Sequence, residues 1–554
     1  MSARVFPLDV ETVRQYGTHA WQGACVWPVP EPEFASLCDR IEQVYARTVH
    51  ERAGIISAAL LVKRSLVVEY YHFLHAILAI ERLRRSGREP RCSASAPWYH
   101  QLLTDSLDVR PDGMVVKTLV PSMRNAARGD MARSAKCIAW TVRLHVAARK
   151  SLWSARGHEA LVSIGVPSEQ AQVYGAQSSA RLSVSWMGDW ISHGVVPVDD
   201  HTRIDLVEAA TSLVGALRDI AQAYGVSLTP VQVRHLQYMS ERQLTDAATA
   251  LQSVRLRRGR DERLLLSTPG DQFGRVLALA LRPLGLSVTS VAHGGSLGLF
   301  DSYTMSVNEF AVSDEFATMT EGSASLFQRI LAAHPPLGGN RVAIVAGTYP
   351  QYHRMFTESR LDPPPKSVRT VMLVGGSYAP WRRPQGTGQF PFYMLHVELE
   401  IIRVLRGSGY EVIYKAHPDR LPEASLLFRD HVRVVGGDLR ECRNDVDAFI
   451  FSTIRTTAFA FALCTMKPVI GFLVEPDRYP LFPDVREILA RRCTLLSLQF
   501  DERGQLTFDG GALIETIARP PTEPDPTFME RYLFPSYATS NTPRNIHRDS
   551  AFTR

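Results

Sequence analysis

From about residue 261 onward, the chain alternates between apolar runs of strand length and amphipathic runs of helix length. A parallel neighbouring strand cannot be reached through a tight turn, so this alternation predicts right-handed β-α-β crossovers and parallel sheets. Strands are expected at 263–267, 287–292, 309–312, 341–346, 370–374, 411–415, 432–435, 448–451, 468–472 and 494–498. Helices are expected at 392–406, 455–464 and 484–491. The predicted fold class is therefore α/β, with two Rossmann-like domains.

The first 255 residues follow a different, mainly helical pattern. Apolar residues recur at helical spacing in 65–85, 132–152 and 205–224, and a short extended piece interrupts them at 91–96. Proline-rich pieces at 363–365 and from 520 onward are typical of a linker and a tail. The predicted units are a largely helical N-terminal region at 1–255, part of or inserted in the first Rossmann-like domain, then Rossmann-like domains at 256–362 and 366–515 and a tail at 516–554.

Composition narrows the class of protein. With 45% hydrophobic and 21% charged residues the chain is expected to be globular, and its net charge of +6 lies mostly on separated arginines, which argues against a nucleic-acid partner. An arginine cluster at 82–91 is either a solvated face or a weak contact with anionic headgroups at the inner face of the cytoplasmic membrane. Seven scattered cysteines without a CxxC pair indicate reduced thiols and no zinc site. With neither a secretory signal nor a run of 18 apolar residues, a cytoplasmic protein is expected.

The first candidate site follows the expected strand 287–292. Ligands of parallel sheets bind at the carboxyl ends of the strands, and His293 stands at such an end, with Gly294 and Gly295 allowing close backbone approach to a ligand. The alternative is a tight turn with an incidental histidine. The motif alone does not separate the two interpretations.

A second candidate is the run Lys415-Ala416-His417-Pro418 after the expected strand 411–415. Proline restrains the preceding histidine to an extended conformation, so its ring can be held in a cleft. An imidazole can donate a hydrogen bond or a proton to a departing phosphate near neutral pH. The alternative is a turn proline beside a surface histidine.

A third candidate is Ser452-Thr453, where the expected strand 448–451 meets a helix. One hydroxyl suffices to cap the helix, so the second hydroxyl, with Arg455 beside it, favours a phosphate site. Weaker signals come from Gly376-Ser377 after strand 370–374, a common turn composition, and from Asp314-Glu315 after strand 309–312. Either carboxylate could deprotonate an acceptor hydroxyl, or both are simply solvated.

The His-Gly-Gly loop combined with Lys-x-His-Pro and Ser-Thr resembles bacterial GT-B transferases of surface-polysaccharide assembly. The likeness is greatest to the group with an HP motif and an S/T motif, which includes capsule Kdo transferases and bacterial sialyl- and polysialyltransferases using CMP-activated sugars. CDP-glycerol polymerases of teichoic acid synthesis are more distantly similar. The HP motif carries over to His417-Pro418 and the S/T motif to Ser452-Thr453, which implies that both contact the CMP phosphate.

The resemblance covers roughly residues 261–500. The acidic motif that supplies the base in sialyltransferases is absent, so His293, Asp314 and Glu315 all stand as candidates for the base. The resemblance implies a metal-independent glycosyltransferase of capsule, lipopolysaccharide or other surface-glycan biosynthesis. Its donor substrate would be a CMP-activated ulosonic acid such as Kdo or a sialic-acid-like sugar, its acceptor a glycan or lipid-linked glycan, and it would need no further cofactor.

Two alternatives remain open at this point. One is a transferase using a UDP-sugar or a CDP-glycerol-type donor on the same fold. The other is a catalytically inactive scaffolding subunit of a polysaccharide assembly complex, with the helical N-terminal region as its interaction surface.

Overall fold

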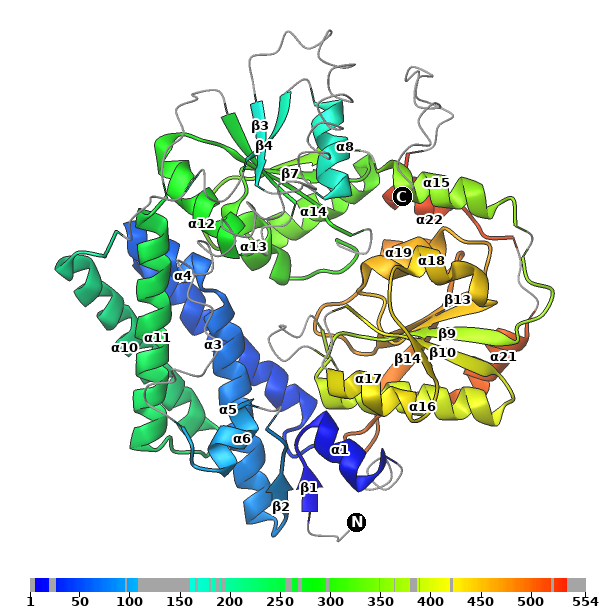
Figure 1. Cartoon of the computed structure of the whole chain (residues 1–554), viewed down its shortest axis with the longest axis horizontal. Helices are drawn as coiled ribbons and strands as arrows, with labels where there is room; N and C mark the ends of the chain where they lie inside the picture. Colours follow the sequence, from blue (N-terminus) through cyan, green and yellow to red (C-terminus); the bar gives the residue numbers. More distant parts are fainter. Residues whose placement is uncertain are drawn as a thin grey trace, which may run out of the picture.

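The computed structural model describes most of the chain, with gaps. The described residues are 5–18, 26–94, 97–107, 160–164, 168–178, 181–185, 190, 196–254, 262–267, 272–294, 298–347, 349–362, 364–378, 386–387, 389–418, 422–519 and 523–535. They form a group of long helices, a two-stranded sheet and two larger, mainly parallel sheets, each of the larger sheets flanked by helices (Figure 1). The helix expected at 132–152 lies outside the described residues.

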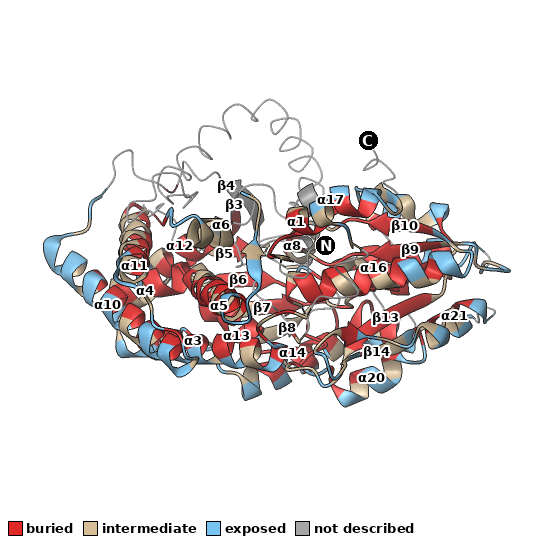
Figure 2. Ribbon diagram, turned by 90° about the horizontal axis from the view of Figure 1, so that it is seen from below, coloured by how far each residue is buried: buried red, intermediate tan, exposed pale blue. Residues whose placement is uncertain are grey.

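The N-terminal helices form what we call the helical arm, at the lower left of Figure 1. It consists of α3 (Glu31–Glu51), α4 (Gly54–Val62), α5 (Ser65–Arg85), α6 (Pro97–Leu103), α10 (Asp200–Ala223) and α11 (Pro230–Gln252). The helix predicted at 65–85 is confirmed as α5, which is buried along most of its length, whereas α10 has an exposed outer face (Figure 2). A capping box between Thr229 and Gln232 starts α11.

A short segment precedes the arm. It contains β1 (Val5–Pro7) and α1 (Val10–Tyr16), and β1 pairs in parallel with β2 (Glu89–Arg91). Of the extended piece expected at 91–96, residues 91–94 are described, and among these only Arg91 belongs to a strand.

The first sheet has six parallel strands in the order β4-β3-β5-β6-β7-β8. Their bounds are β3 (Ala160–Ile164), β4 (Arg181–Ser185), β5 (Glu262–Leu266), β6 (Val288–Val291), β7 (Glu315–Thr318) and β8 (Ala343–Ala346). Its described helices are α8 (Glu169–Gln177), α12 (Gln272–Leu281), α13 (Thr304–Asn308) and α14 (Glu321–Ala333). Strands β3 and β4 come from the region before residue 255, and the pair α10–α11 is inserted between β4 and β5.

One strand prediction in this sheet is wrong. Residues 309–312 do not form a strand: Phe310–Val312 is a 3-10 turn that continues from α13, and the strand follows as β7. All three residues of the turn are buried. A short apolar run that is buried on all sides has no periodicity to separate a strand from a helical turn, which explains the error.

The second sheet has seven strands in the order β11-β10-β9-β12-β13-β14-β15. They are β9 (Thr370–Val374), β10 (Glu411–Lys415), β11 (Arg433–Val435), β12 (Ala448–Phe451), β13 (Val469–Val474), β14 (Thr494–Phe500) and β15 (Leu506–Thr507), and only the edge pair β14–β15 is antiparallel. Numbered along the chain, the parallel strands follow the order 3-2-1-4-5-6 of a doubly wound Rossmann sheet. The expected fold class, two Rossmann-like domains with a largely helical N-terminal region, is confirmed.

Helices cover the second sheet as expected. They are α16 (Pro391–Gly407), α17 (Pro422–Arg429), α18 (Leu439–Cys442), α19 (Thr457–Leu463), α20 (Pro483–Leu489) and α21 (Gly510–Ala518). The three helices predicted at 392–406, 455–464 and 484–491 correspond to α16, α19 and α20.

The chain returns to the first domain after crossing the second. Helix α22 (Thr527–Tyr532), within the predicted tail, packs against α14, and the Thr320 hydroxyl donates to the Arg531 carbonyl. It lies beside α15 (Pro350–Ser359) at the upper right of Figure 1. The chain therefore passes between the two domains twice.

The helical arm contacts both domains. The buried Arg275 of α12 donates through Nε to the Leu61 carbonyl of α4, at 2.9 Å. On the other side, Arg478 of the second domain pairs with Asp39 of α3. Within the described part of the chain, no helix combines the length and apolar character needed to cross a bilayer.

Candidate functional site

Three strands of the second sheet end level with one another. Lys415 of β10 and Phe451 of β12 both pair with Val374, the last residue of β9. Neighbouring strands lie about 4.8 Å apart, so the three strand ends fall within about 10 Å. Between β9 and β12 the strand order reverses, and doubly wound sheets bind ligands in the crevice at this switch point. The loops carrying His417, Gly376 and Ser452 therefore share one edge of the sheet.

A buried carboxylate joins the loops after β9 and β12 to strand β10. Glu398 of α16 is 0% exposed. Its Oε1 accepts from the Gly376 amide at 2.8 Å and the Ser452 hydroxyl at 2.6 Å, and its Oε2 accepts from the hydroxyls of Tyr378 at 2.6 Å and Tyr414 at 2.7 Å. Burial raises the pKa of Glu398, and its hydrogen bonds oppose that rise.

Sequence reasoning missed Glu398, although a signal was present. The helix predicted at 392–406 carries this carboxylate between Val397 and Leu399, among residues that the helix buries. A carboxylate on a buried helix face needs partners, so its position alone indicated a polar network beneath the sheet.

Ser452 and Thr453 are adjacent, but their side chains have different partners. Ser452 is 2% exposed and its hydroxyl is directed to Glu398. Thr453 is half-buried, and its Oγ1 accepts from Gln389 Nε2 at 3.3 Å and the Arg455 amide at 3.4 Å. The cap of α19 is Thr456, whose side chain accepts from the Phe459 amide. Neither hydroxyl of the pair therefore caps the helix.

Lys415, His417 and Pro418 lie at the carboxyl end of β10. Lys415 is buried, and its Nζ donates to the Ala416 carbonyl at 3.2 Å. Side chains alternate along a strand, so Lys415 faces away from the side on which Tyr414 reaches α16. His417 is half-buried and Pro418 is exposed. Of the polar side chains in this run, His417 is the one that lies beyond the end of β10.

Arg455 connects the two domains. Its guanidinium pairs with Asp477 at 2.8 Å and lies 3.5 Å from the ring centroid of Phe300, a residue of the first domain. Burial lowers the pKa of Arg455, while Asp477 raises it. The side chain expected to bind phosphate is therefore engaged in an ion pair and a cation–π contact.

The His293 loop touches the second domain directly. His293 is exposed at the carboxyl end of β6, and its carbonyl accepts from Gln170 Nε2 at 3.4 Å. A Cβ placed on Gly294 would lie 2.6 Å from Oγ1 of Thr457, the first residue of α19. The carboxyl edges of the two sheets therefore face each other, with the loop after β6 against the start of α19. Gly295 lies outside the described residues.

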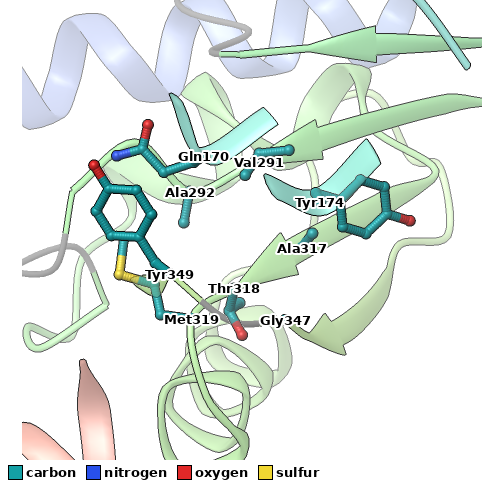
Figure 3. A pocket seen from close by; sticks show the side chains of 9 residues that line it. All are labelled: Gln170, Tyr174, Val291, Ala292, Ala317, Thr318, Met319, Gly347 and Tyr349. Carbon is teal, nitrogen blue, oxygen red and sulfur yellow. The ribbon is translucent and has the colours of Figure 1, made fainter. Parts of the chain in front are cut away.

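A small pocket lies behind this loop (Figure 3). The carboxyl ends of β6, β7 and β8 line it together with side chains of α8, and Tyr349 and Gln170 stand at one end of it (Figure 3). The nine lining residues are all uncharged: Gln170, Tyr174, Val291, Ala292, Ala317, Thr318, Met319, Gly347 and Tyr349.

The structure separates the two carboxylates Asp314 and Glu315 from His293. They stand at the amino end of β7, whereas His293 follows the carboxyl end of β6, its parallel neighbour. Asp314 accepts from the Val288 amide at 2.8 Å and pairs with Arg282 at 3.2 Å. Their expected position at a strand's carboxyl end is wrong, because the strand begins at Glu315.

Glu315 has its own partners at that edge. It pairs with Arg263 at 3.6 Å and accepts from the Tyr174 hydroxyl. Both carboxylates therefore stabilise the amino edge of the sheet, opposite the loops that face the second domain.

Among known proteins, solved structures show a weak likeness to the chain. No protein-family model and no curated protein sequence matches the chain. A solved structure of Phytolacca americana UGT2, complexed with UDP-2fluoro-glucose and pterostilbene, aligns over 66% of this chain and 84% of that chain, with 10% sequence identity and a TM-score of 0.28. At this TM-score the likeness decides nothing, and the fold rests on the chain's own strand order.

Proposed function

We propose that the chain is a glycosyltransferase of the GT-B type that serves capsule, lipopolysaccharide or other bacterial surface-glycan biosynthesis. Its donor would be a CMP-activated ulosonic acid, Kdo or a sialic-acid-like sugar, and its acceptor a glycan or lipid-linked glycan. The single observation that carries this proposal is the contact of Gly294 with Thr457, which brings the His293 loop of one Rossmann-like sheet to the edge of the other.

On the donor side, the proposed phosphate position is the switch point of the second sheet. The loop between β12 and α19 carries Thr453 there, and His417 stands two residues beyond β10 in the neighbouring crossover. At a switch point the loops after the two neighbouring strands run in opposite directions, which leaves a crevice for a ligand between them. A donor phosphate at this edge would lie within reach of an imidazole able to stabilise the leaving group.

On the acceptor side, His293 is the proposed base. It is exposed at the edge facing the second domain, and an imidazole can take a proton from a hydroxyl near neutral pH. As the acceptor oxygen bonds to the anomeric carbon, the bond from that carbon to the phosphate oxygen would break and CMP would leave. Close contact between the domains would exclude water that otherwise hydrolyses the donor.

Thermal-shift screening of the full chain against CMP, CDP, UDP and GDP tests the donor, because a ligand that binds only the folded state raises its stability. CMP is expected to give the largest shift, and CMP should be released from a CMP-sugar in the presence of acceptor. Release of UDP from a UDP-sugar would contradict the proposed donor and favour the diphosphate alternative. No shift and no release with any of them would favour a scaffolding subunit.

His417→Ala tests the catalytic assignment. Loss of a positioned acid or hydrogen-bond donor should lower kcat by about 10²- to 10⁴-fold. His201→Ala is the matched control, because its side chain is 88% exposed on α10 in the helical arm. Equal activity of the two variants, with the melting temperature of each unchanged, would remove His417 from the mechanism.

A further inference from the structure

Glu398 accepts as many hydrogen bonds as a carboxylate can. An ionised carboxylate has about four lone-pair sites, and each of its two oxygens here accepts from two donors at 2.6–2.8 Å. Protonation would turn one of these acceptor sites into a donor, and one of the three hydroxyls would then have to turn and accept. The arrangement therefore matches a carboxylate surrounded by four placed donors.

The four donors come from the three strands that meet at the switch point. Gly376 and Tyr378 follow β9, Tyr414 lies in β10, and Ser452 follows β12. A single side chain of α16 thus ties the segments whose loops surround the proposed phosphate position. One carboxylate therefore contacts all three segments.

The loop after β9 is shaped for this network. A Cβ on Gly375 would fall 1.9 Å from the Tyr414 hydroxyl oxygen, so a larger residue would displace the tyrosine from Glu398. Gly376 contributes its amide, at 2.8 Å from Oε1. Gly375 therefore leaves the room that Tyr414 needs to reach Glu398, whereas Gly376 takes part through its backbone amide.

We infer that Glu398 is a positioning residue that holds the loops after β9 and β12 in one arrangement around the donor site, and that Ser452 serves this carboxylate instead of the phosphate. That these loops surround a donor site rests on the proposed function. The hydroxyl of Ser452 is already committed to Oε1 at 2.6 Å and is 2% exposed, which leaves Thr453 as the side chain of the pair nearer to a ligand.

Glu398→Gln in the full chain tests the positioning role without any ligand. The amide nitrogen of glutamine cannot accept a hydrogen bond, so the two partners at the oxygen that it replaces lose their acceptor, and a hydroxyl there must turn to accept from the amide instead. Hydrogen–deuterium exchange of peptides spanning 375–378 and 452–456 is expected to accelerate at least about tenfold, while peptides of α5 keep their rate and report a folded arm. Glu400→Gln is the matched control, because Glu400 lies on the same helix and pairs with Arg403 one turn along.

Nucleotide binding then tests the coupling to the donor site. CMP affinity should fall about tenfold or more in Glu398→Gln and stay at the wild-type value in Glu400→Gln. Unchanged exchange in both loops overturns the inference, and so does a lower melting temperature with unchanged CMP affinity. A wild-type protein that binds none of the four nucleotides contradicts the proposed function, whereas the exchange measurement still decides the role of Glu398.

A gentler variant covers the case in which Glu398→Gln fails to fold. Tyr414→Phe removes one donor and keeps the carboxylate, so the same two peptides should exchange faster by a smaller factor. Tyr410→Phe, just before β10, is its control. Exchange that is equal in these two variants also overturns the inference.

Discussion

At the scale of single residues, Glu69 is a half-buried acid of the helical arm with a raised pKa. It lies on α5, and Gln243 of α11 donates to its Oε2 at 2.8 Å. Burial raises its pKa from 4.5 to about 7, against the opposing effects of the Gln243 hydrogen bond and of Lys63. Lys63 is itself paired with Asp246 at 3.2 Å, so its charge offsets that of Glu69 only in part.

The stability of the arm should therefore decrease as the pH rises. A raised folded-state pKa means that the folded chain holds the proton more tightly, so the stability from this group is full below about pH 4.5 and is lost as the pH rises through about 7. The expected loss is on the order of 3 kcal/mol. Urea unfolding followed at pH 5 and pH 8 should show this slope in the wild type and a reduced slope in Glu69→Gln.

The control for this prediction lies on the same helix. Glu81 of α5 has a side chain that is 38% exposed and pairs with Arg84. Glu81→Gln should retain the wild-type dependence on pH. A Glu69→Gln variant with the full wild-type slope would show that another group carries it.

At the scale of elements, the cap of α19 gives a sharp test of the loop beside the proposed donor site. Thr456 accepts from the Phe459 amide at 3.2 Å, and loss of a threonine N-cap typically costs about 1 kcal/mol. Thr456→Ala should lower the melting temperature, whereas Thr456→Ser or Thr456→Asp should retain most of the stability. The melting temperatures of the three variants can be measured by circular dichroism. An alanine variant as stable as the wild type would mean that another group caps the helix.

The central strands are the part of the fold that the sequence predicts best. β9, β10 and β12 occupy the expected residues, because a strand covered on both faces by helices must be apolar along almost its whole length. β3 and β4 were not expected, since ALVSI and RLSVS interleave serines with apolar residues and lie inside a region of helical periodicity. Strand β7 begins with Glu315, whose partner Arg263 lies on a different strand, so no local pattern indicates it.

The candidate site, like the fold, is predicted only in part by the sequence. The positions of His293, His417 and Ser452 at strand ends follow from the sequence, because apolar runs end there. The partners of the neighbouring side chains do not follow, because Glu398 reaches Ser452 from a separate helix and Phe300 reaches Arg455 from the other domain. Sequence patterns locate an edge of a sheet, whereas the role of each side chain at that edge depends on segments brought there by folding.

At the scale of the whole molecule, several contacts hold the two domains edge to edge. Phe300 and Leu481 form an antiparallel bridge, and the Asp301 amide donates to the Pro480 carbonyl at 3.0 Å. Arg329 of α14 pairs with Asp484 at 2.9 Å and lies 4.0 Å from the ring centroid of Phe482. The linker composition of the sequence indicated two units without indicating how they would meet.

Gly294 is the residue at which this meeting can be tested most directly. Gly294→Ala would place a methyl group 2.6 Å from Thr457 Oγ1, so either the loop after β6 or the start of α19 must move, and overpacking of this kind costs about 1–3 kcal/mol. Thr457→Ala removes the opposing hydroxyl, and the double variant Gly294→Ala/Thr457→Ala should therefore recover most of the stability that Gly294→Ala loses. Additive losses in this double-mutant cycle, measured by thermal unfolding, would mean that the two domains do not touch here in solution. Gly407→Ala, at the end of α16 where a Cβ meets open space, is the control for an added methyl group. This variant should not show the loss of stability expected for Gly294→Ala.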